Sequence, residues 1–238
     1  MTRLIFSLGL VVIGMGTGYL IQVMVGKGRL GLELATFRTR LQKAALLFFN
    51  PVAILGATWA AGLDNIKIAA LPFLGMTALF CGAGLAWTAA RALNLNRPQT
   101  GSFLVCGGFT NIGSLGALFC FMFLGEKGFA LVPFYKLFEE TIYYAVGFPL
   151  AKSFGQDLSR TPSFLNRIRS AVTDVFVLTA VSCIAAGLIL NLSGIPRPGI
   201  YFAVNQVFIP LAALLLLISI GTAMRFSSVR TFFRPGLI

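Results

Sequence analysis

Three side chains that carry charge lie within one apolar stretch of the sequence: Lys136, Glu139 and Glu140. Charged groups inside a membrane-spanning helix are costly and are therefore candidates for function. Lys136 precedes the two glutamates by three and four residues, so the three share one helix face. Two interpretations stay open: the glutamates carry coupling protons or hold a cation, or the three residues form an ion pair at a helix interface or extend toward the outer surface.

A second polar group stands in the glycine-rich segment 101–118, where Thr110, Asn111 and Ser114 lie among four glycines: Gly107, Gly108, Gly113 and Gly116. Glycine weakens a helix and lets another backbone approach closely. Either the segment unwinds, so that helix ends and the Asn111 amide face a ligand, or it packs closely against a neighbouring helix with Asn111 bonding across the interface.

The chain contains no histidine. This excludes Ser-His-Asp and Cys-His nucleophilic pairs, His-ligated zinc and His-ligated haem. The four cysteines show no CxxC spacing, and we interpret them as small apolar packing residues. We expect no enzymatic activity, no cofactor and no metal.

The elements that must position these residues are membrane helices, since 57% of the chain is hydrophobic and only 11% is charged. No cleavable signal peptide is evident. Apolar stretches of about 20 residues predict an all-α polytopic membrane protein with about seven transmembrane helices. The predicted spans are roughly Leu4–Val25, Leu41–Gly62, Ile68–Ala90, Ser102–Leu124, Phe129–Ser153, Ala171–Leu192 and Phe202–Met224.

The basic residues alternate between the two sides of these spans. Of the 19 lysines and arginines, fourteen fall in the odd-numbered connections, at the span ends that border them, or in the C-terminus, and one, Lys136, lies deeper within a span. The N-terminus and the even-numbered connections hold four: Arg3, Lys67, Lys127 and Arg197. The positive-inside rule then predicts a multi-pass protein of the cell's inner or plasma membrane, with the N-terminus outside and the C-terminus cytoplasmic. The net charge of +12 is thus a topology signal, and we expect lipid as a partner and no nucleic acid.

Two of the spans contain a proline, at Asn50-Pro51 and at Ile209-Pro210, and a glycine follows each proline eleven residues later, at Gly62 and Gly221. A proline inside a helix removes a hydrogen bond and clashes with the preceding turn. The recurrence predicts a duplicated membrane unit with broken helices, which is typical of secondary transporters.

Several motifs occur along nearly the whole chain in a characteristic order: Gly14-Met-Gly16-Thr-Gly18-Tyr-Leu, Leu47-Phe-Phe-Asn-Pro51, Cys106-Gly-Gly-Phe-Thr-Asn111-Ile-Gly113-Ser-Leu-Gly116, Leu124-Gly125-Glu126-Lys127-Gly128, Gly187-Leu-Ile-Leu-Asn-Leu-Ser-Gly194-Ile-Pro196 and Ile209-Pro210-Leu-Ala-Ala. This order resembles the auxin efflux carrier family of permeases, within the bile/arsenite/riboflavin transporter-like superfamily. This chain departs from the family pattern in the fifth span, where the family would have an asparagine near the position of Glu139.

The resemblance implies a fold of ten helices in two inverted five-helix repeats, whose broken helices cross near the bilayer centre. It implies small organic anions, such as carboxylates or indole acids, as substrates. The substrate-binding residues would be Asn111, Gly113, Ser114 and Gly116, supported by Asn50, Pro51 and Pro210. Partially positive helix N-termini and amide donors suit an anion, and Lys136, Glu139 and Glu140 are the ion-coupling candidates.

On this scheme residues 1–155 form the first repeat, 156–170 a cytoplasmic linker and 171–238 the first two helices of an inverted second repeat. The counterparts of the third to fifth spans do not follow Gly221. We therefore expect an incomplete permease polypeptide: a truncated product, or a piece completed by a C-terminal chain or by a second copy in a homo-oligomer. The alternative is a seven-helix membrane sensor or scaffold without transport activity.

Overall fold

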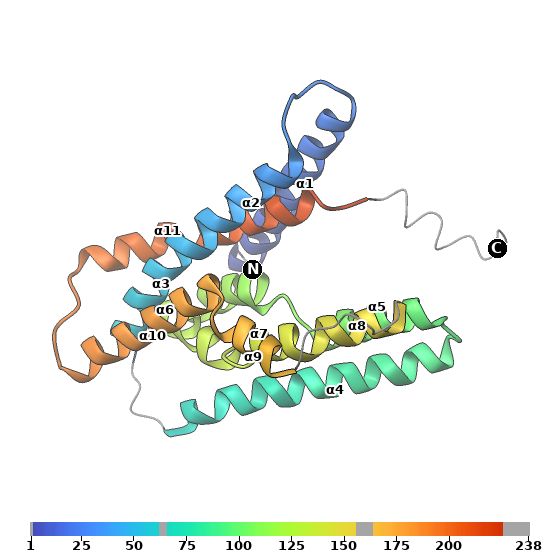
Figure 1. The fold of residues 1–238 in the computed structure, drawn as a ribbon. Helices are drawn as coiled ribbons and strands as arrows, with labels where there is room; N and C mark the ends of the chain where they lie inside the picture. Colours follow the sequence, from blue (N-terminus) through green and yellow to red (C-terminus); the bar gives the residue numbers. More distant parts are fainter. Residues whose placement is uncertain (1, 62–65, 156–163, 226–238) are drawn as a thin grey trace.

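The computed structural model describes residues 2–61, 66–155 and 164–225, and regular structure within these ranges is entirely helical (Figure 1). Gly62, which follows Pro51 by eleven residues, lies outside the described residues, as do three of the fourteen basic residues counted above: Arg160, Arg230 and Arg234. The α-helices are α1 (Thr2–Gly26), α2 (Leu34–Ala44), α3 (Asn50–Trp59), α4 (Leu71–Ala92), α5 (Arg97–Gly108), α6 (Ala117–Tyr135), α7 (Glu139–Ile142), α8 (Phe148–Gly155), α9 (Phe164–Val172), α10 (Val175–Leu192) and α11 (Ile200–Gly221). Shorter elements are the 3₁₀-helix η2 (Ile66–Ala70) and the π-helices η1 (Ala45–Phe49), η3 (Ile112–Gly116) and η4 (Tyr143–Gly147).

Six stretches of the described residues are long and apolar enough to cross a membrane: Arg3–Gly26, Leu34–Trp59, Ile68–Ala92, Arg97–Tyr135, Val175–Leu192 and Ile200–Gly221. The chain is therefore an all-α protein with the character of a multi-pass membrane protein. The sequence predicted about seven spans, and the difference arises in the predicted fifth span. That span is divided by a turn at residues 136–138: the part before the turn ends the stretch Arg97–Tyr135, and the helical part after it, residues 139–155, is too short to count.

The predicted turn between the fourth and fifth spans is present inside α6. Gly125 has φ +69° and ψ −159°, and two helices meet at this kink. A positive φ is easily adopted by glycine because it has no Cβ. The predicted linker 156–170 is in part helical, since α9 begins at Phe164.

Neither proline breaks its helix, so the prediction of broken helices at Pro51 and Pro210 is wrong. Pro51 is the second residue of α3, which continues directly from α2 through the π-helix η1. The N–H of Asn50 bonds to the carbonyl of Ala45, five residues earlier, and this local widening accommodates the proline. Pro210 lies within the uninterrupted helix α11.

Two of the predicted spans, the fourth and the fifth, each contain a short non-helical segment, which we call an interruption. Helix α5 ends at Gly108, and residues 109–111 are non-helical before η3 and α6 begin. Helix α6 ends at Tyr135, and residues 136–138 form a turn before α7. The two interruptions thus fall at the polar groups of the fourth and fifth predicted spans.

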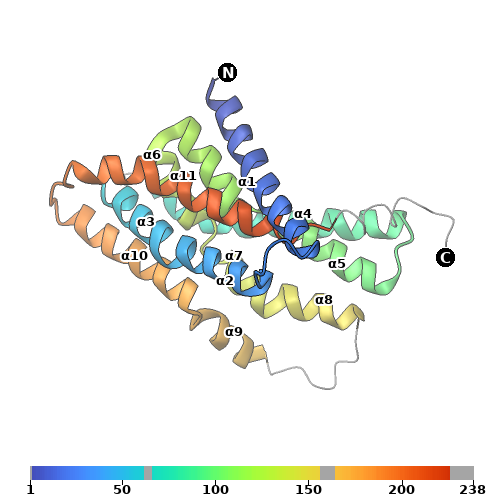
Figure 2. The same cartoon turned by 90° about the horizontal axis from the view of Figure 1, so that it is seen from above.

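The helices form two groups (Figures 1 and 2). In one group α1 packs against α11, and α3 packs against both α10 and α11. In the other, α5 lies between α4 and α8. Helix α6 joins the groups, and a hydrophobic core forms where α3, α6, α10 and α11 meet, around Ala53, Phe121, Phe129, Ile184 and Ile209.

Contacts between connections show which ends of the helices lie together. The Arg3 guanidinium donates to the carbonyl of Phe123 at 3.4 Å, and the Trp59 indole N–H donates to the carbonyl of Ile195 at 2.8 Å. At the other end of the spans, the start of α5 at Gly101 lies against Phe154 near the end of α8. This pairing of ends agrees with helices that cross in alternating directions.

Candidate functional site

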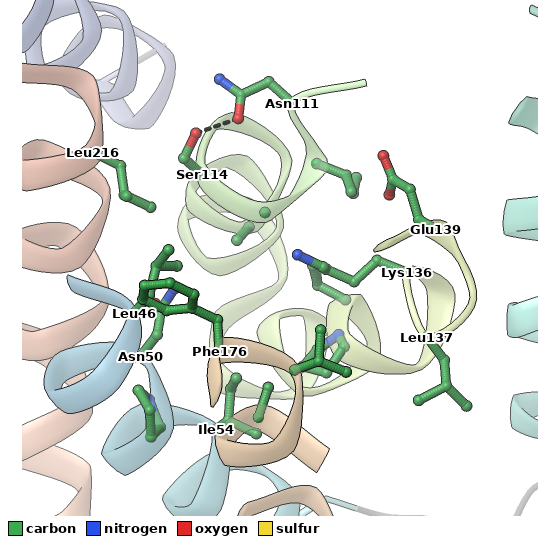
Figure 3. A pocket seen from close by; sticks show the side chains of 18 of the residues that line it. Leu46, Asn50, Ile54, Asn111, Ser114, Lys136, Leu137, Glu139, Phe176 and Leu216 are labelled. Carbon is green, nitrogen blue, oxygen red and sulfur yellow. Dashed lines mark hydrogen bonds between the residues drawn. The ribbon is translucent and has the colours of Figure 1, made fainter. Parts of the chain in front are cut away.

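A cavity of about 640 Å³ lies between the two interruptions (Figure 3). Its volume falls within the range of about 300–1,000 Å³ that small-molecule sites occupy. The α2–α3 helix, both interruptions, α10 and α11 all contribute to its lining. The polar lining residues are Gln42, Asn50, Thr110, Asn111, Ser114, Lys136, Glu139 and Tyr143.

The first interruption presents the start of a helix to the cavity. The backbone N–H groups of Leu115 and Gly116 both donate to the carbonyl of Asn111, at 3.0 and 3.2 Å. The N–H groups of residues 112–114 therefore come before the first hydrogen bond of the helix, at its partially positive end. The Ser114 hydroxyl donates to Oδ1 of Asn111 within the same turn.

Close packing explains the glycines before this interruption. A Cβ atom at Gly107 would lie 2.4 Å from Cβ of Ala86, and one at Gly82 would lie 2.4 Å from the carbonyl oxygen of Gly107. Gly107 and Gly108 thus let α5 approach α4. The close packing expected of a small-residue interface is therefore present at Gly107 and Gly108. The Asn111 side chain accepts a hydrogen bond from Ser114 within its own turn.

The glycines after the interruption have different surroundings. A Cβ atom at Gly113 would have one neighbour within 4 Å, Nζ of Lys136 at 3.1 Å. A Cβ atom at Gly116 would lie 2.3 Å from Cδ1 of Ile112 in its own helix. Gly113 lines the cavity, whereas Gly116 is outside the lining.

The second interruption supplies the charged residues of the cavity. Lys136 follows the last residue of α6, and its carbonyl accepts a hydrogen bond of 3.0 Å from the N–H of Glu139. Figure 3 shows the Lys136 side chain extending into the cavity. The side chains of Glu139 and Leu137 point in directions that differ from that of Lys136. Lys136 and Glu139 both line the cavity. Glu140 belongs to α7, but its side chain is outside the described part of the structure.

An aromatic contact fixes the two interrupted segments against each other. The rings of Phe109 and Tyr143 meet edge to face, with 4.6 Å between their centroids. A Cβ atom at Gly147 would lie only 2.6 Å from Cε2 of Phe109, so η4 and the first interruption are closely packed. Tyr143 was not predicted as a site residue.

The two helices that contain Pro51 and Pro210 contribute unequally to the lining of the cavity. Asn50 and Pro51 line the cavity, but Pro210 does not, and α11 contributes Leu216 and Ile220 instead. Helix α10 supplies an apolar wall that was not predicted: Phe176, Val177, Ala180, Val181 and Ile184. Their spacing marks one helix face. Gln42 was also missed, although it lies eight residues before Asn50 on the same continuous helix.

Arg197, Glu126 and Asn191 form a cluster of polar contacts at the C-terminal end of α3, which we call the α3 polar cluster. Arg197 pairs with Glu126 and also donates to the carbonyl of Gly56 at 2.9 Å. The Asn191 amide donates to the carbonyls of Trp59 and Ala61, at 2.7 and 2.8 Å. These carbonyls belong to the last turn of α3 and the residues just beyond it, where backbone acceptors lack helical partners. The α10–α11 hairpin therefore caps the end of α3.

Comparison with protein-family models, curated proteins and solved structures found no significant match. The resemblance to the auxin efflux carrier family thus stays a prediction.

Proposed function

We propose that this chain is a secondary transporter, a permease of small organic anions such as carboxylates, in the cell's inner or plasma membrane. The observation that supports this best is the pair of helix interruptions on either side of one cavity. Non-helical backbone at membrane depth is tolerated where it is buried in protein or lines a cavity. Substrate sites of secondary transporters are commonly built from such discontinuous helices.

The polarity of the cavity favours an anion. The helix start at residues 112–114 and the Lys136 ammonium both bring positive charge to the same space. The amides of Asn50 and Asn111 add hydrogen-bond donors to the lining. Glu139 is the opposing charge, and we propose it as the ion-coupling residue.

Two matching contacts support an inverted repeat. A Cβ atom at Gly14 in α1 would lie 2.8 Å from Cβ of Leu217 in α11, and one at Gly187 in α10 would lie 2.9 Å from Cβ of Thr58 in α3. Leu217 and Thr58 each stand seven residues after a proline, Pro210 and Pro51. The first helix of each proposed unit therefore packs at the same position on the second helix of the other. The charge distribution supports an N-terminus outside the cell.

The test is uptake of labelled organic anions that cross lipid slowly: malonate, gluconate and benzenesulfonate. Membrane vesicles from cells producing the chain retain any partner that the cell supplies. We expect saturable uptake of at least one of these anions, and a loss of about tenfold or more in the Asn111→Ala variant, which removes a charge-assisted hydrogen bond to the substrate. Equal uptake by vesicles with the chain, with the variant and without the chain would overturn the proposal.

A further inference from the structure

The cavity is divided into a polar part and an apolar part. The two interruptions provide the charged and most of the polar residues, including Asn111, Ser114, Lys136 and Glu139, and the α2–α3 helix adds the uncharged amides of Gln42 and Asn50. The apolar part is the wall of α10 and α11, which includes Phe176 and Leu216, both in the left half of Figure 3. Among the described lining residues, Lys136 and Glu139 are the charged ones. A ligand that fills this space meets charge at one end and hydrocarbon along its body.

Lys136 lies directly against the start of the η3–α6 helix. Its Nζ is 3.1 Å from the position that a Cβ atom at Gly113 would take, which is closer than most Cβ contacts. Gly113 therefore leaves the space that the ammonium occupies. The ammonium and the partially positive N-terminus of the helix stand side by side, an arrangement that is unfavourable for another cation and favourable for an anion.

We infer that Lys136 is the residue that binds the charged group of the substrate, and that the site selects a monocarboxylate with an apolar body. This inference rests on the proposed function, and it gives Lys136 a role in recognition instead of coupling. An ammonium carries three donors, so Lys136 can keep its contacts within the protein and still donate to a carboxylate. The N–H groups at the start of η3 approach the same carboxylate from the helix side.

The same geometry disfavours a dicarboxylate. A second carboxylate on the ligand would lie either near Glu139, where like charges repel, or among the apolar α10 wall and the uncharged amides of Gln42 and Asn50, where no cation pairs with it. An apolar group of similar size pays neither cost, because Val177, Ala180 and Ile184 offer it hydrocarbon contacts.

The test is equilibrium binding to the purified, detergent-solubilised chain, with three ligands of similar shape: benzoate with one charge, benzamide with none and terephthalate with two. We expect benzoate to bind more tightly than either of the others. Lys136→Gln weakens benzoate binding by about ten- to a hundredfold, the range of a hydrogen bond to a charged group. Benzamide binding stays within about twofold in this variant, since benzamide does not need the ammonium, and this also shows that the variant is folded.

Two further variants provide controls. Lys136→Arg keeps the positive charge and restores most of the preference for benzoate over benzamide. Lys127→Gln removes a lysine that is exposed beside the Gly125 kink and leaves binding unchanged.

The inference is overturned if wild-type protein does not bind benzoate, if terephthalate binds as tightly as benzoate, or if Lys136→Gln binds benzoate like wild type. These outcomes are separable from failure of transport. Anion uptake that depends on Asn111, together with a Lys136→Gln variant that binds benzoate normally, contradicts the inference alone. Lys136-dependent binding without uptake in vesicles contradicts the proposed transport alone.

Discussion

Gly113 and Lys136 meet where the two interrupted helices approach each other, with the lysine Nζ 3.1 Å from the position of a Cβ atom on the glycine. The contact joins the backbone at the start of one helix to the side chain at the end of another. A methyl group at this position would require the end of the lysine side chain to move by a few tenths of an ångström, so the placement of the ammonium is sensitive to it.

The first prediction concerns that methyl group. Gly113→Ala should displace the ammonium and weaken benzoate binding by about three- to tenfold, because a charged hydrogen bond loses its geometry. In a Lys136→Ala background the same substitution should have no further effect on benzoate binding, which a double-variant cycle measures. Gly84→Ala is the matched control, since a Cβ atom there would have no neighbour within 4 Å. Additive effects of Gly113→Ala and Lys136→Ala would contradict the contact.

The second prediction concerns the packing of α1 on α11. A Cβ atom at Gly18 would lie 2.1 Å from the carbonyl oxygen of Ile218, so Gly18→Ala should separate the helices and cost about 1–3 kcal/mol. Gly16, two residues earlier, has nothing within 4 Å of a Cβ atom, so Gly16→Ala should be neutral or stabilise the helix by up to about 1 kcal/mol. Thermal unfolding in detergent compares them, and equal midpoints would argue against this helix contact.

The third prediction concerns the α3 polar cluster, formed by Arg197, Glu126 and Asn191. The side chains of Arg197 and Glu126 are only 15% and 12% exposed, so removing one partner leaves a nearly buried charge. Arg197→Gln should therefore lower stability by a sizeable part of the about 3–5 kcal/mol that breaking a buried pair costs. Arg197→Gln combined with Glu126→Gln should recover part of that loss. A double variant that is the sum of the two single variants would show that the pair is not coupled.

The fourth prediction concerns orientation in the membrane. In a background without Cys81, Cys106, Cys120 and Cys183, a membrane-impermeant maleimide should label Lys127→Cys on intact cells. It should label Lys152→Cys only after the cells are permeabilised, because the two positions belong to connections on opposite sides in the proposed topology. The reverse pattern would place the N-terminus inside.

The positions of membrane helices were accessible to sequence reasoning because length and apolar content decide them locally. The stretches at Arg3–Gly26, Ile68–Ala92 and Ile200–Gly221 lie close to their predicted spans. Asn111 and Lys136 could be singled out because a polar or charged side chain in an apolar stretch needs a reason. The structure brings both to one cavity.

The glycines around Asn111 made unwinding one of two alternatives for segment 101–118, and residues 109–111 are non-helical. The location of the second interruption could not be deduced from residue type alone. A proline lacks one hydrogen bond, and a π-helical turn ahead of Pro51 accommodates it without breaking the helix. Pro133 stands three residues before the interruption at Lys136, but α6 continues through this proline to Tyr135, so the proline alone does not show where the helix ends. The α10 wall and the Arg197–Glu126 pair depend on contacts between residues far apart in the chain, which no local pattern encodes.

The central claim is that an organic anion passes through the cavity between the two interruptions. The most direct measurement uses whichever of the three labelled anions wild-type vesicles take up, and compares its initial uptake rate in vesicles that contain either of two tryptophan variants of α10. Ala180→Trp fills the cavity from its α10 wall, whereas Ala185→Trp adds the same bulk at an exposed position of the same helix that is outside the lining. We expect Ala180→Trp to abolish uptake and Ala185→Trp to keep it. Uptake at the wild-type rate by the Ala180→Trp variant would contradict the account.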